Sequence, residues 1–151
     1  MSQLNEELLN AWLRVSTSIV NSRIVSELTY NETLVCNVLY RCRLEGRERP
    51  LTATDLCGMT NMLKSQMNRT LNLLEGRGLI IRQRSTEDKR QVFVFFNADR
   101  SEAYETQHSR ILKLLDGIIE ELGEEKAGEV VQSLLHIAQI ADGILKDKKD
   151  I

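Results

Sequence analysis

Residues 52–96 decide the fold of this 151-residue chain, and they read TATDLCGMTNMLKSQMNRTLNLLEGRGLIIRQRSTEDKRQVFVFF. Thr52 and Asp55 have the spacing of a capping box, in which each side chain accepts a hydrogen bond from a free N–H group of the first helical turn. They predict a short helix, which a tight turn at 60–62 ends. The next helix has an apolar face at helical spacing, formed by Met67, Leu71 and Leu74. The pattern predicts a helix-turn-helix over about 52–76.

A β-hairpin is predicted after the second helix. The runs 79–84 and 91–96 are rich in β-branched and aromatic residues, which favour strands. The polar segment 85–90 separates the two runs. We therefore expect an antiparallel hairpin, or wing, over about 79–96.

The second helix of the motif carries a polar outward face. The major groove of DNA admits an α-helix, whose donors and acceptors then reach base edges and phosphates. The face consists of Lys64, Ser65, Gln66, Asn68, Arg69 and Asn72. In this architecture we expect it to contact DNA, with Arg69 as its strongest contributor.

The wing adds a second basic element. The negative potential of a minor groove attracts cations, which suits Lys89 and Arg90 at the tip. We expect Arg82, Arg84 and Lys89 to contact phosphates, because most hydrogen bonds at such interfaces go to the backbone. Asp88 is expected to hold an arginine by a charge-assisted bond and so keep the shape of the loop.

Another capping box precedes the motif. Thr29 and Glu32 are spaced to open a helix that runs to about Leu44, where Gly46 can end it in the left-handed region. Its expected buried stripe is Leu34, Val35, Val38 and Leu39.

Amphipathic helices are predicted at both ends of the chain. Apolar residues recur at helical spacing over 4–27 and again over 98–148, where Gly123 interrupts the pattern. These helices carry more apolar surface than a compact monomer of this length can bury. They predict a partner subunit.

Charge is distributed unevenly along the chain. The formal net charge is −2, but residues 41–90 carry 11 Lys and Arg against 6 Asp and Glu. This segment is therefore at +5 and the remainder at −7. The basic segment coincides with the predicted helix-turn-helix and wing, which points to an anionic partner.

With these elements in this order, the sequence resembles the MarR (multiple antibiotic resistance regulator) family of winged helix-turn-helix transcription factors. Five segments carry the resemblance, of which the last is the most specific: Leu28-Thr29-x-x-Glu32-x-x-Val35-x-x-Val38-Leu39, Leu51-Thr52-x-x-Asp55-Leu56, Lys64-Ser65-Gln66-Met67-Asn68-Arg69, Leu74-Glu75-Gly76-Arg77-Gly78-Leu79-Ile80 and Asp88-Lys89-Arg90. The resemblance implies a mainly α fold with about six helices. It implies one domain over 1–151, with a DNA-binding lobe at 29–97 and dimerisation helices at 4–27 and 98–148.

The resemblance also implies a function. A homodimer would place its two lobes on a pseudo-palindromic DNA operator, with Arg90 in the minor groove and Asp88 as its organiser. We therefore expect a repressor that binds double-stranded DNA and responds to a small-molecule effector, for which an aromatic compound is the candidate. The sequence does not identify the residues of the effector site.

Two positions depart from the family pattern. Leu63 stands where the family has a serine or threonine cap, so we expect Thr60 or Asn61 to cap the recognition helix. The corner after the wing reads Phe96-Asn97-Ala98-Asp99-Arg100 in place of the usual Leu-Thr-x-x-Gly. We expect this corner to be built differently.

Other functions have weaker support. Cys36 and Cys57 fall at predicted core positions, and the odd count of three cysteines, with Cys42, indicates no disulfide framework. His108 and His136 lack the spacing of a metal site, so we expect no metal and no other cofactor. A redox- or metal-responsive regulator of the same fold and a winged-helix protein-interaction module remain as alternatives.

Catalysis and membrane insertion are not expected. No catalytic residues are predicted, because nucleophile–base pairs and glycine-rich phosphate loops are lacking. The longest apolar run, 92–96, is too short to span a membrane, and the first residues do not resemble a signal peptide. We expect a cytoplasmic protein that is not an enzyme.

Trp12 and Tyr40 are candidates for an effector cavity, although large aromatics are more often core.

Overall fold

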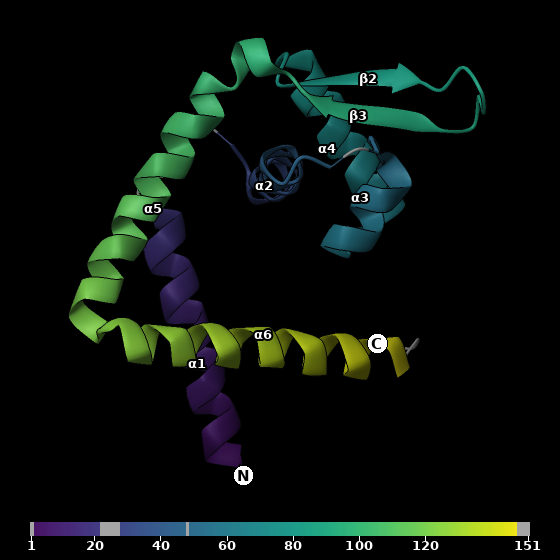
Figure 1. Cartoon of the computed structure of the whole chain (residues 1–151). Coiled ribbons are helices and arrows are strands. Elements are labelled where there is room, and N and C mark those ends of the chain that lie inside the picture. Colours follow the sequence, from purple (N-terminus) through teal and green to yellow (C-terminus); the bar gives the residue numbers. More distant parts are fainter. Residues whose placement is uncertain (1, 22–27, 48, 148–151) are drawn as a thin grey trace. The chain divides into compact units, whose positions relative to one another are not determined.

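The computed structural model describes residues 2–21, 28–47 and 49–147. The chain divides into two compact units, residues 1–109 and 110–151. The first unit contains the helix-turn-helix and the wing (Figure 1). No helix of the described part has the length and apolar character that crossing a membrane requires.

Helix α2 (Tyr30–Leu44) begins at the predicted capping box. The Glu32 N–H donates to Thr29 Oγ1 at 3.2 Å, and the Thr29 N–H donates to Glu32 Oε1 at 3.3 Å. Gly46 follows the helix with a φ of 66°, a conformation that glycine adopts without a steric penalty. Both predicted ends of this helix are confirmed.

Helices α3 (Ala53–Thr60) and α4 (Lys64–Gly76) form the predicted helix-turn-helix. Thr52 caps α3 together with Asp55, whose carboxylate accepts from the Thr52 N–H at 2.9 Å. Asn61 lies in the left-handed region at φ 57°, which makes the turn between the two helices tight.

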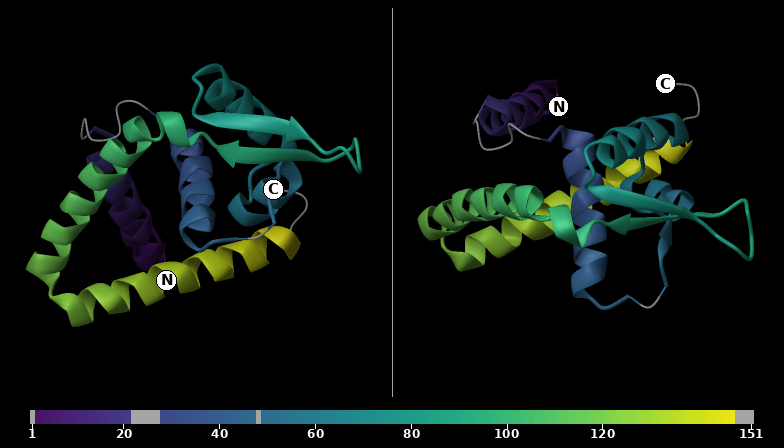
Figure 2. Two further views of the ribbon diagram at one scale, coloured as in Figure 1. Left: turned by 45° about the horizontal axis from the view of Figure 1, so that its top comes forward. Right: turned by 90° about the horizontal axis from the view of Figure 1, so that it is seen from above.

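Strands β2 (Ile80–Arg84) and β3 (Val92–Phe96) form the predicted antiparallel hairpin, with Arg82 opposite Val94. A third strand, β1 (Leu51–Thr52), pairs with the other edge of β3. The strand order is β1-β3-β2, so the sheet has one strand more than the sequence predicts. The hairpin loop projects past α3 and α4 (Figure 2).

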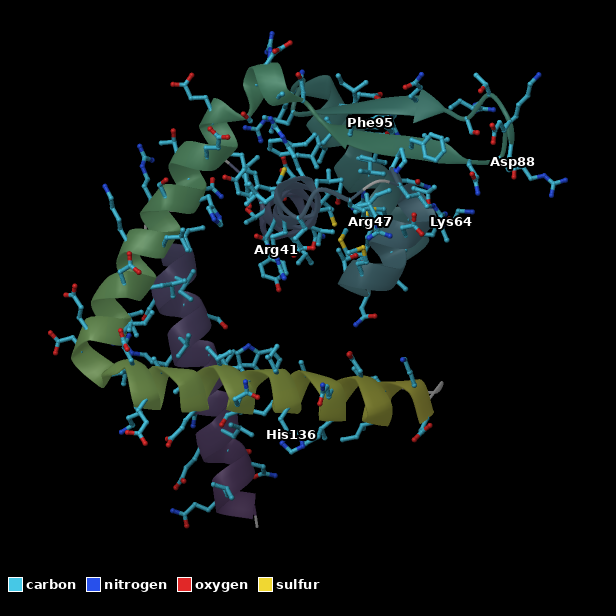
Figure 3. The ribbon with its side chains drawn as sticks, viewed as in Figure 1. Arg41, Arg47, Lys64, Asp88, Phe95 and His136 are labelled. Carbon is cyan, nitrogen blue, oxygen red and sulfur yellow. The ribbon has the colours of Figure 1, made fainter. Side chains whose placement is uncertain are left out.

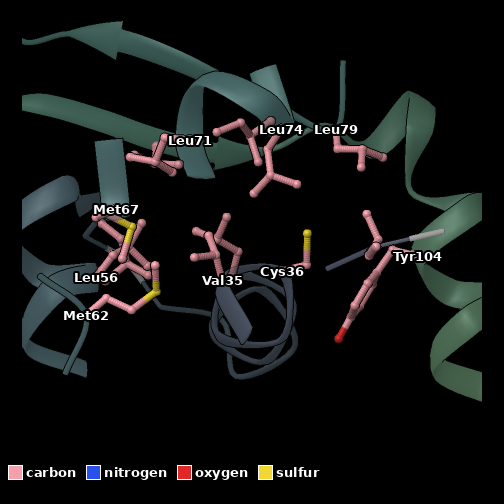
Figure 4. Close-up of a cluster of buried hydrophobic side chains, with 14 residues drawn as sticks. Val35, Cys36, Leu56, Met62, Met67, Leu71, Leu74, Leu79 and Tyr104 are labelled. Carbon is pink, nitrogen blue, oxygen red and sulfur yellow. The ribbon is translucent and has the colours of Figure 1, made fainter. Parts of the chain in front are cut away.

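The core of the lobe lies between the sheet and helices α2, α3 and α4 (Figure 4). Met67, Leu71 and Leu74 of α4 are buried, as their spacing predicts. In α2, Val35 and Leu39 are buried, whereas Leu34 and Val38 pack half-buried against the cluster. Because the apolar face of α4 packs into this core, the opposite, polar face of the helix is exposed to solvent.

The corner after β3 is organised by Asn97. Asn97 caps a short 3₁₀ helix (Ala98–Arg100), and its Nδ2 donates to the Gly78 carbonyl at 2.7 Å. Gly78 has a φ of 74°, and a Cβ there would lie 3.3 Å from Cδ of Arg100. A single asparagine therefore ties the exit of the wing to the turn after α4.

Helix α5 (Glu102–Leu122) follows this corner, and Gly123, at φ 85°, separates it from α6 (Glu124–Asp147). Tyr104 of α5 is buried in the core of the lobe. Helix α1 (Ser2–Asn21) starts two residues before its predicted beginning. The predicted continuation at 22–27, and residue 148, lie outside the described residues.

Large apolar side chains are exposed on all three outer helices. On α1 they include Leu4 and Trp12, each with an exposed fraction of 70%. On α6 they are Val130, Val131, Leu134, Leu135, Ile137, Ile140, Ile144 and Leu145, with exposed fractions between 41% and 61%. The surplus apolar surface that the sequence predicts is present on the chain.

Candidate nucleic-acid interface

The outward face of α4 is fully presented to solvent. All six residues that the sequence predicts for DNA contact on this helix are exposed: Lys64, Ser65, Gln66, Asn68, Arg69 and Asn72. Lys64 lies at the first turn of the helix (Figure 3). One helix thus brings four amide or hydroxyl groups and two cations to one surface.

The cap of α4 differs from the expected one. The helix begins at Lys64 with Leu63 in the cap position, so Thr60 and Asn61 do not cap it. Thr60 is instead the last residue of α3, and its hydroxyl donates to the Leu56 carbonyl at 2.6 Å. The Leu63 N–H donates to Gln66 Oε1 at 3.1 Å, which is the bond that the third helical residue supplies in a capping box. Leucine has no side-chain acceptor, so the other bond of the box is missing.

Arg82 joins the wing to the recognition helix. Its guanidinium donates to both carboxylate oxygens of Glu75, at 3.0 and 2.9 Å, and to Asn72 Oδ1 at 2.7 Å. The fork geometry is the one in which arginine binds carboxylates most strongly. Two predicted DNA contacts, Asn72 and Arg82, therefore form a hydrogen bond with each other at the surface of the lobe. Glu75, which holds Arg82, gave no signal in the sequence beyond its charge.

The Glu75–Arg82 pair makes stability depend on pH. The hydrogen bond from Arg82 is the main cause that lowers the pKa of Glu75 below its ordinary value. A carboxyl with a lowered pKa in the folded state stabilises the fold above its unfolded pKa, and this contribution disappears as the pH falls. When the pH is lowered from about 5 to about 3, the free energy of unfolding should therefore fall less in Arg82→Ala than in the wild type.

Denaturant unfolding at several pH values measures this difference. Arg84→Ala is the matched control, because Arg84 ends the same strand but forms no ion pair within the described residues. The control should follow the wild-type pH dependence. Parallel curves for the wild type and Arg82→Ala would contradict the role of the pair.

The wing loop is held by its own hydrogen bonds. Ser85 Oγ accepts from the N–H groups of Glu87 and Asp88, both at 3.2 Å. Asp88 Oδ1 accepts from the Arg90 N–H at 3.0 Å, and the Gln91 N–H donates to the Asp88 carbonyl at 2.9 Å. Asp88 thus contacts the arginine backbone, whereas we expected a bond to an arginine side chain. The contact shapes the loop and leaves the Arg90 guanidinium exposed.

The cations of this surface fall into two groups. Arg77 and Arg82 form ion pairs with Glu32 and Glu75 within the lobe. Five others are exposed and form no ion pair with any described residue: Lys64, Arg69, Arg84, Lys89 and Arg90. Asp88 lies in the loop beyond the strands, where Lys89 and Arg90 follow it (Figure 3). Unpaired cations on a helix and a loop suit a polyanion.

The cysteines occupy different environments. Cys36 is fully buried, and this burial raises the pKa of its thiol to about 12. A thiol with this pKa forms little of the reactive thiolate at neutral pH. Cys57, predicted as core, is only half-buried, and it lines a shallow hollow between α3 and α4 with Lys64 and Asn68. Cys42 is also half-buried.

Tyr40 packs edge-on against Tyr104 and Phe96 and tilted against His108, with centroid distances of 5.5 to 6.3 Å. Trp12, the other aromatic candidate for a cavity, is exposed on α1. His136 is exposed on α6. Among the described residues, no group of three or more potential ligands is placed to hold a metal ion.

The model of the MarR family matches residues 38–91, which include the whole helix-turn-helix and the loop of the wing. The DNA-binding lobe of this chain is therefore similar to that of MarR-family regulators. The HTH-type transcriptional regulator FarR of Neisseria gonorrhoeae is 28% identical over 102 residues, which cover 68% of this chain and 70% of FarR. These matches support a DNA-binding transcriptional regulator that is similar to those of the MarR family.

Solved structures of MarR-type regulators share the fold. NadR in complex with 4-hydroxyphenylacetate is 25% identical, with a TM-score of 0.68 over 91% of this chain and 93% of NadR. The transcriptional repressor CouR bound to a 23-mer DNA duplex is 23% identical, with a TM-score of 0.69 over 89% of this chain and 92% of CouR. The mainly α winged-helix architecture is thereby confirmed.

Proposed function

We propose that this chain is a MarR-family repressor that binds a pseudo-palindromic operator as a homodimer. Helix α4 enters the major groove, where Lys64, Ser65, Gln66, Asn68 and Arg69 meet base edges and phosphates. Arg90 enters the minor groove, and Arg84 and Lys89 contact phosphates. The observation that carries this proposal is the pair of surfaces on one lobe, a polar helix face and a rigid basic loop, whose cations form no ion pairs with described residues.

Asn72 and Arg82 act within this proposal as positioning residues. Their bonds to each other and to Glu75 connect α4 to the first wing strand. A rigid link between the two DNA-contacting elements fixes the spacing of major-groove and minor-groove contacts. Because this link engages Asn72 Oδ1 and the Nε and Nη2 groups of Arg82, we expect these two side chains to contribute less direct DNA contact than the sequence predicts.

The homodimer is proposed because the outer helices expose continuous apolar faces. An apolar stripe of this size on a water-soluble protein is typical of an interface. Two lobes must also stand roughly 34–36 Å apart to meet successive major grooves. A second copy of the chain supplies both the cover for the apolar faces and the second lobe.

Leu134→Glu tests the dimer. Leu134 of α6 has an exposed fraction of 61%, so a charge there is tolerated by the monomer but is buried in the proposed dimer. We expect this variant to elute as a monomer at micromolar concentration in sizing chromatography and to bind DNA at least tenfold more weakly. Leu44→Glu is the matched control, because Leu44 is as exposed, at 69%, but ends α2 in the DNA-binding lobe.

The wild type and the control should both be dimers. A monomeric wild type would contradict the proposal, and so would a Leu134→Glu variant that remains dimeric.

A reporter gene behind an operator selected from random duplexes tests the sign of regulation. Expression should fall when the chain is produced, whereas a rise would identify an activator.

A small aromatic effector is proposed as the regulating signal. The support is NadR, which was solved with 4-hydroxyphenylacetate and shares the fold of this chain. A ligand changes DNA affinity only if it binds one spacing of the two lobes better than the other. Such a ligand would release the operator by favouring a spacing that two successive grooves do not match.

A further inference from the structure

The first turn of α4 begins with an apolar residue. Leu63 stands in the cap position of this helix with an exposed fraction of 67%. In a helix-turn-helix, the N-terminal residues of the second helix come closest to base edges. A leucine there has no donor or acceptor, so the apolar group that it meets on a major-groove edge is the C5-methyl of thymine.

Gln66, one turn along the same helix, is held in one orientation. Its Oε1 accepts from the Leu63 N–H at 3.1 Å. Only an oxygen can accept this bond, so the amide nitrogen Nε2 occupies the other position of the carboxamide. This nitrogen donates to no other group among the described residues. Its two N–H groups are therefore available to an acceptor outside the chain.

This orientation changes what Gln66 reads. A glutamine that recognises adenine uses its oxygen and its nitrogen together, accepting from N6 and donating to N7. In this chain the oxygen is engaged by the helix backbone, and the side chain presents donors. Donors suit guanine N7 and O6 or thymine O4, and of these bases only thymine carries a methyl group beside its acceptor.

We propose that Leu63 and Gln66 together read one thymine in each half-site of the operator. The methyl group packs against the Leu63 side chain, and O4 accepts from Gln66 Nε2. This inference rests on the proposed function, because it requires α4 to enter a major groove. It adds the identity of a base and the two residues that determine it.

Uracil substitution tests the methyl contact directly. A high-affinity duplex is first selected from a random library with the full-length protein, and each thymine is then replaced by uracil, which lacks only the methyl group. At one thymine in each half-site, we expect wild-type affinity to fall about fourfold, the effect of one buried methyl group. Leu63→Ala should bind the thymine and uracil duplexes equally well.

A second base analogue tests the O4 contact. 5-Methylcytosine paired with guanine keeps the methyl group but presents an amine donor in place of the O4 acceptor. Wild-type affinity should fall about tenfold at the same position, and Gln66→Ala should lose this preference. Each test compares two duplexes bound by the same variant, so a general change in affinity cancels.

Leu73→Ala is the matched control for the leucine. Leu73 lies on the same helix with an exposed fraction of 52%, but near its far end. This variant should discriminate thymine from uracil as well as the wild type does. A selected operator in which every thymine tolerates uracil would overturn the thymine proposal alone, and so would undiminished discrimination by Leu63→Ala. Failure to select any sequence would instead contradict the proposed function.

Discussion

Arg90→Ala should weaken binding of the proposed dimer to the selected operator by about thirtyfold or more and leave the Tm unchanged. A single specific arginine contact is worth roughly 1–3 kcal/mol, and a dimer loses two of them. The Arg90 side chain is exposed and forms no ion pair with a described residue. The contact with Asp88 uses the Arg90 N–H, which alanine retains, so the loop should keep its shape.

Arg41→Ala controls for the loss of one positive charge. Arg41 is exposed on α2, where its ion pair with Glu45 is long, at 3.9 Å. Such surface pairs contribute little to stability. Fluorescence anisotropy at fixed salt should show a small loss for Arg41→Ala and a large one for Arg90→Ala. Equal losses of affinity would mean that Arg90 contributes only its positive charge, and they would contradict a specific contact of this side chain with DNA.

Leu74→Ala should lower the free energy of unfolding by about 2–5 kcal/mol, the range for a leucine removed from a packed core. Leu74 is fully buried at the end of α4, where it packs in the core of the lobe (Figure 4). The substitution leaves a cavity in the cluster that positions the recognition helix. For a domain with an ordinary stability of 5–15 kcal/mol, this is a large fraction of the total.

Leu73→Ala is the neighbouring comparison, because Leu73 has an exposed fraction of 52%. Its substitution should change the free energy of unfolding by less than about 1 kcal/mol. Chemical denaturation of both variants at the same protein concentration gives the comparison. Similar losses for the two leucines would contradict the assignment of the inward face of α4, and with it the orientation of the polar face.

Local signals in the sequence predicted most of the elements. The capping boxes at Thr29 and Thr52 pair residues three positions apart, so the sequence alone contains both partners of each bond. Met67, Leu71 and Leu74 showed the buried face of α4 in the same way. The polar face of the candidate site followed, because it is the opposite side of that helix.

Contacts between distant segments could not be predicted in this way. β1 has two residues, too few for a strand pattern, and it exists because Leu51 pairs with Val94 across the folded lobe. The bond between Arg82 and Asn72 likewise depends on how β2 packs against α4. At Leu63, the expectation failed because the helix begins without a side-chain cap, and only the Gln66 side chain bonds back to the Leu63 N–H. These corrections refine the site, since they separate residues that position α4 and the wing from residues left exposed for DNA.

The salt dependence of affinity for the selected duplex tests the central claim most directly. Each neutralised phosphate of duplex DNA contributes a slope of about −0.9 to log K against log salt concentration. The phosphate contacts of Arg84 and Lys89 in each of two lobes predict a slope of about −4. A steep slope that becomes shallower in the Arg84→Ala and Lys89→Ala variants is the result that we expect. A slope near zero would contradict the role of this basic surface in binding DNA.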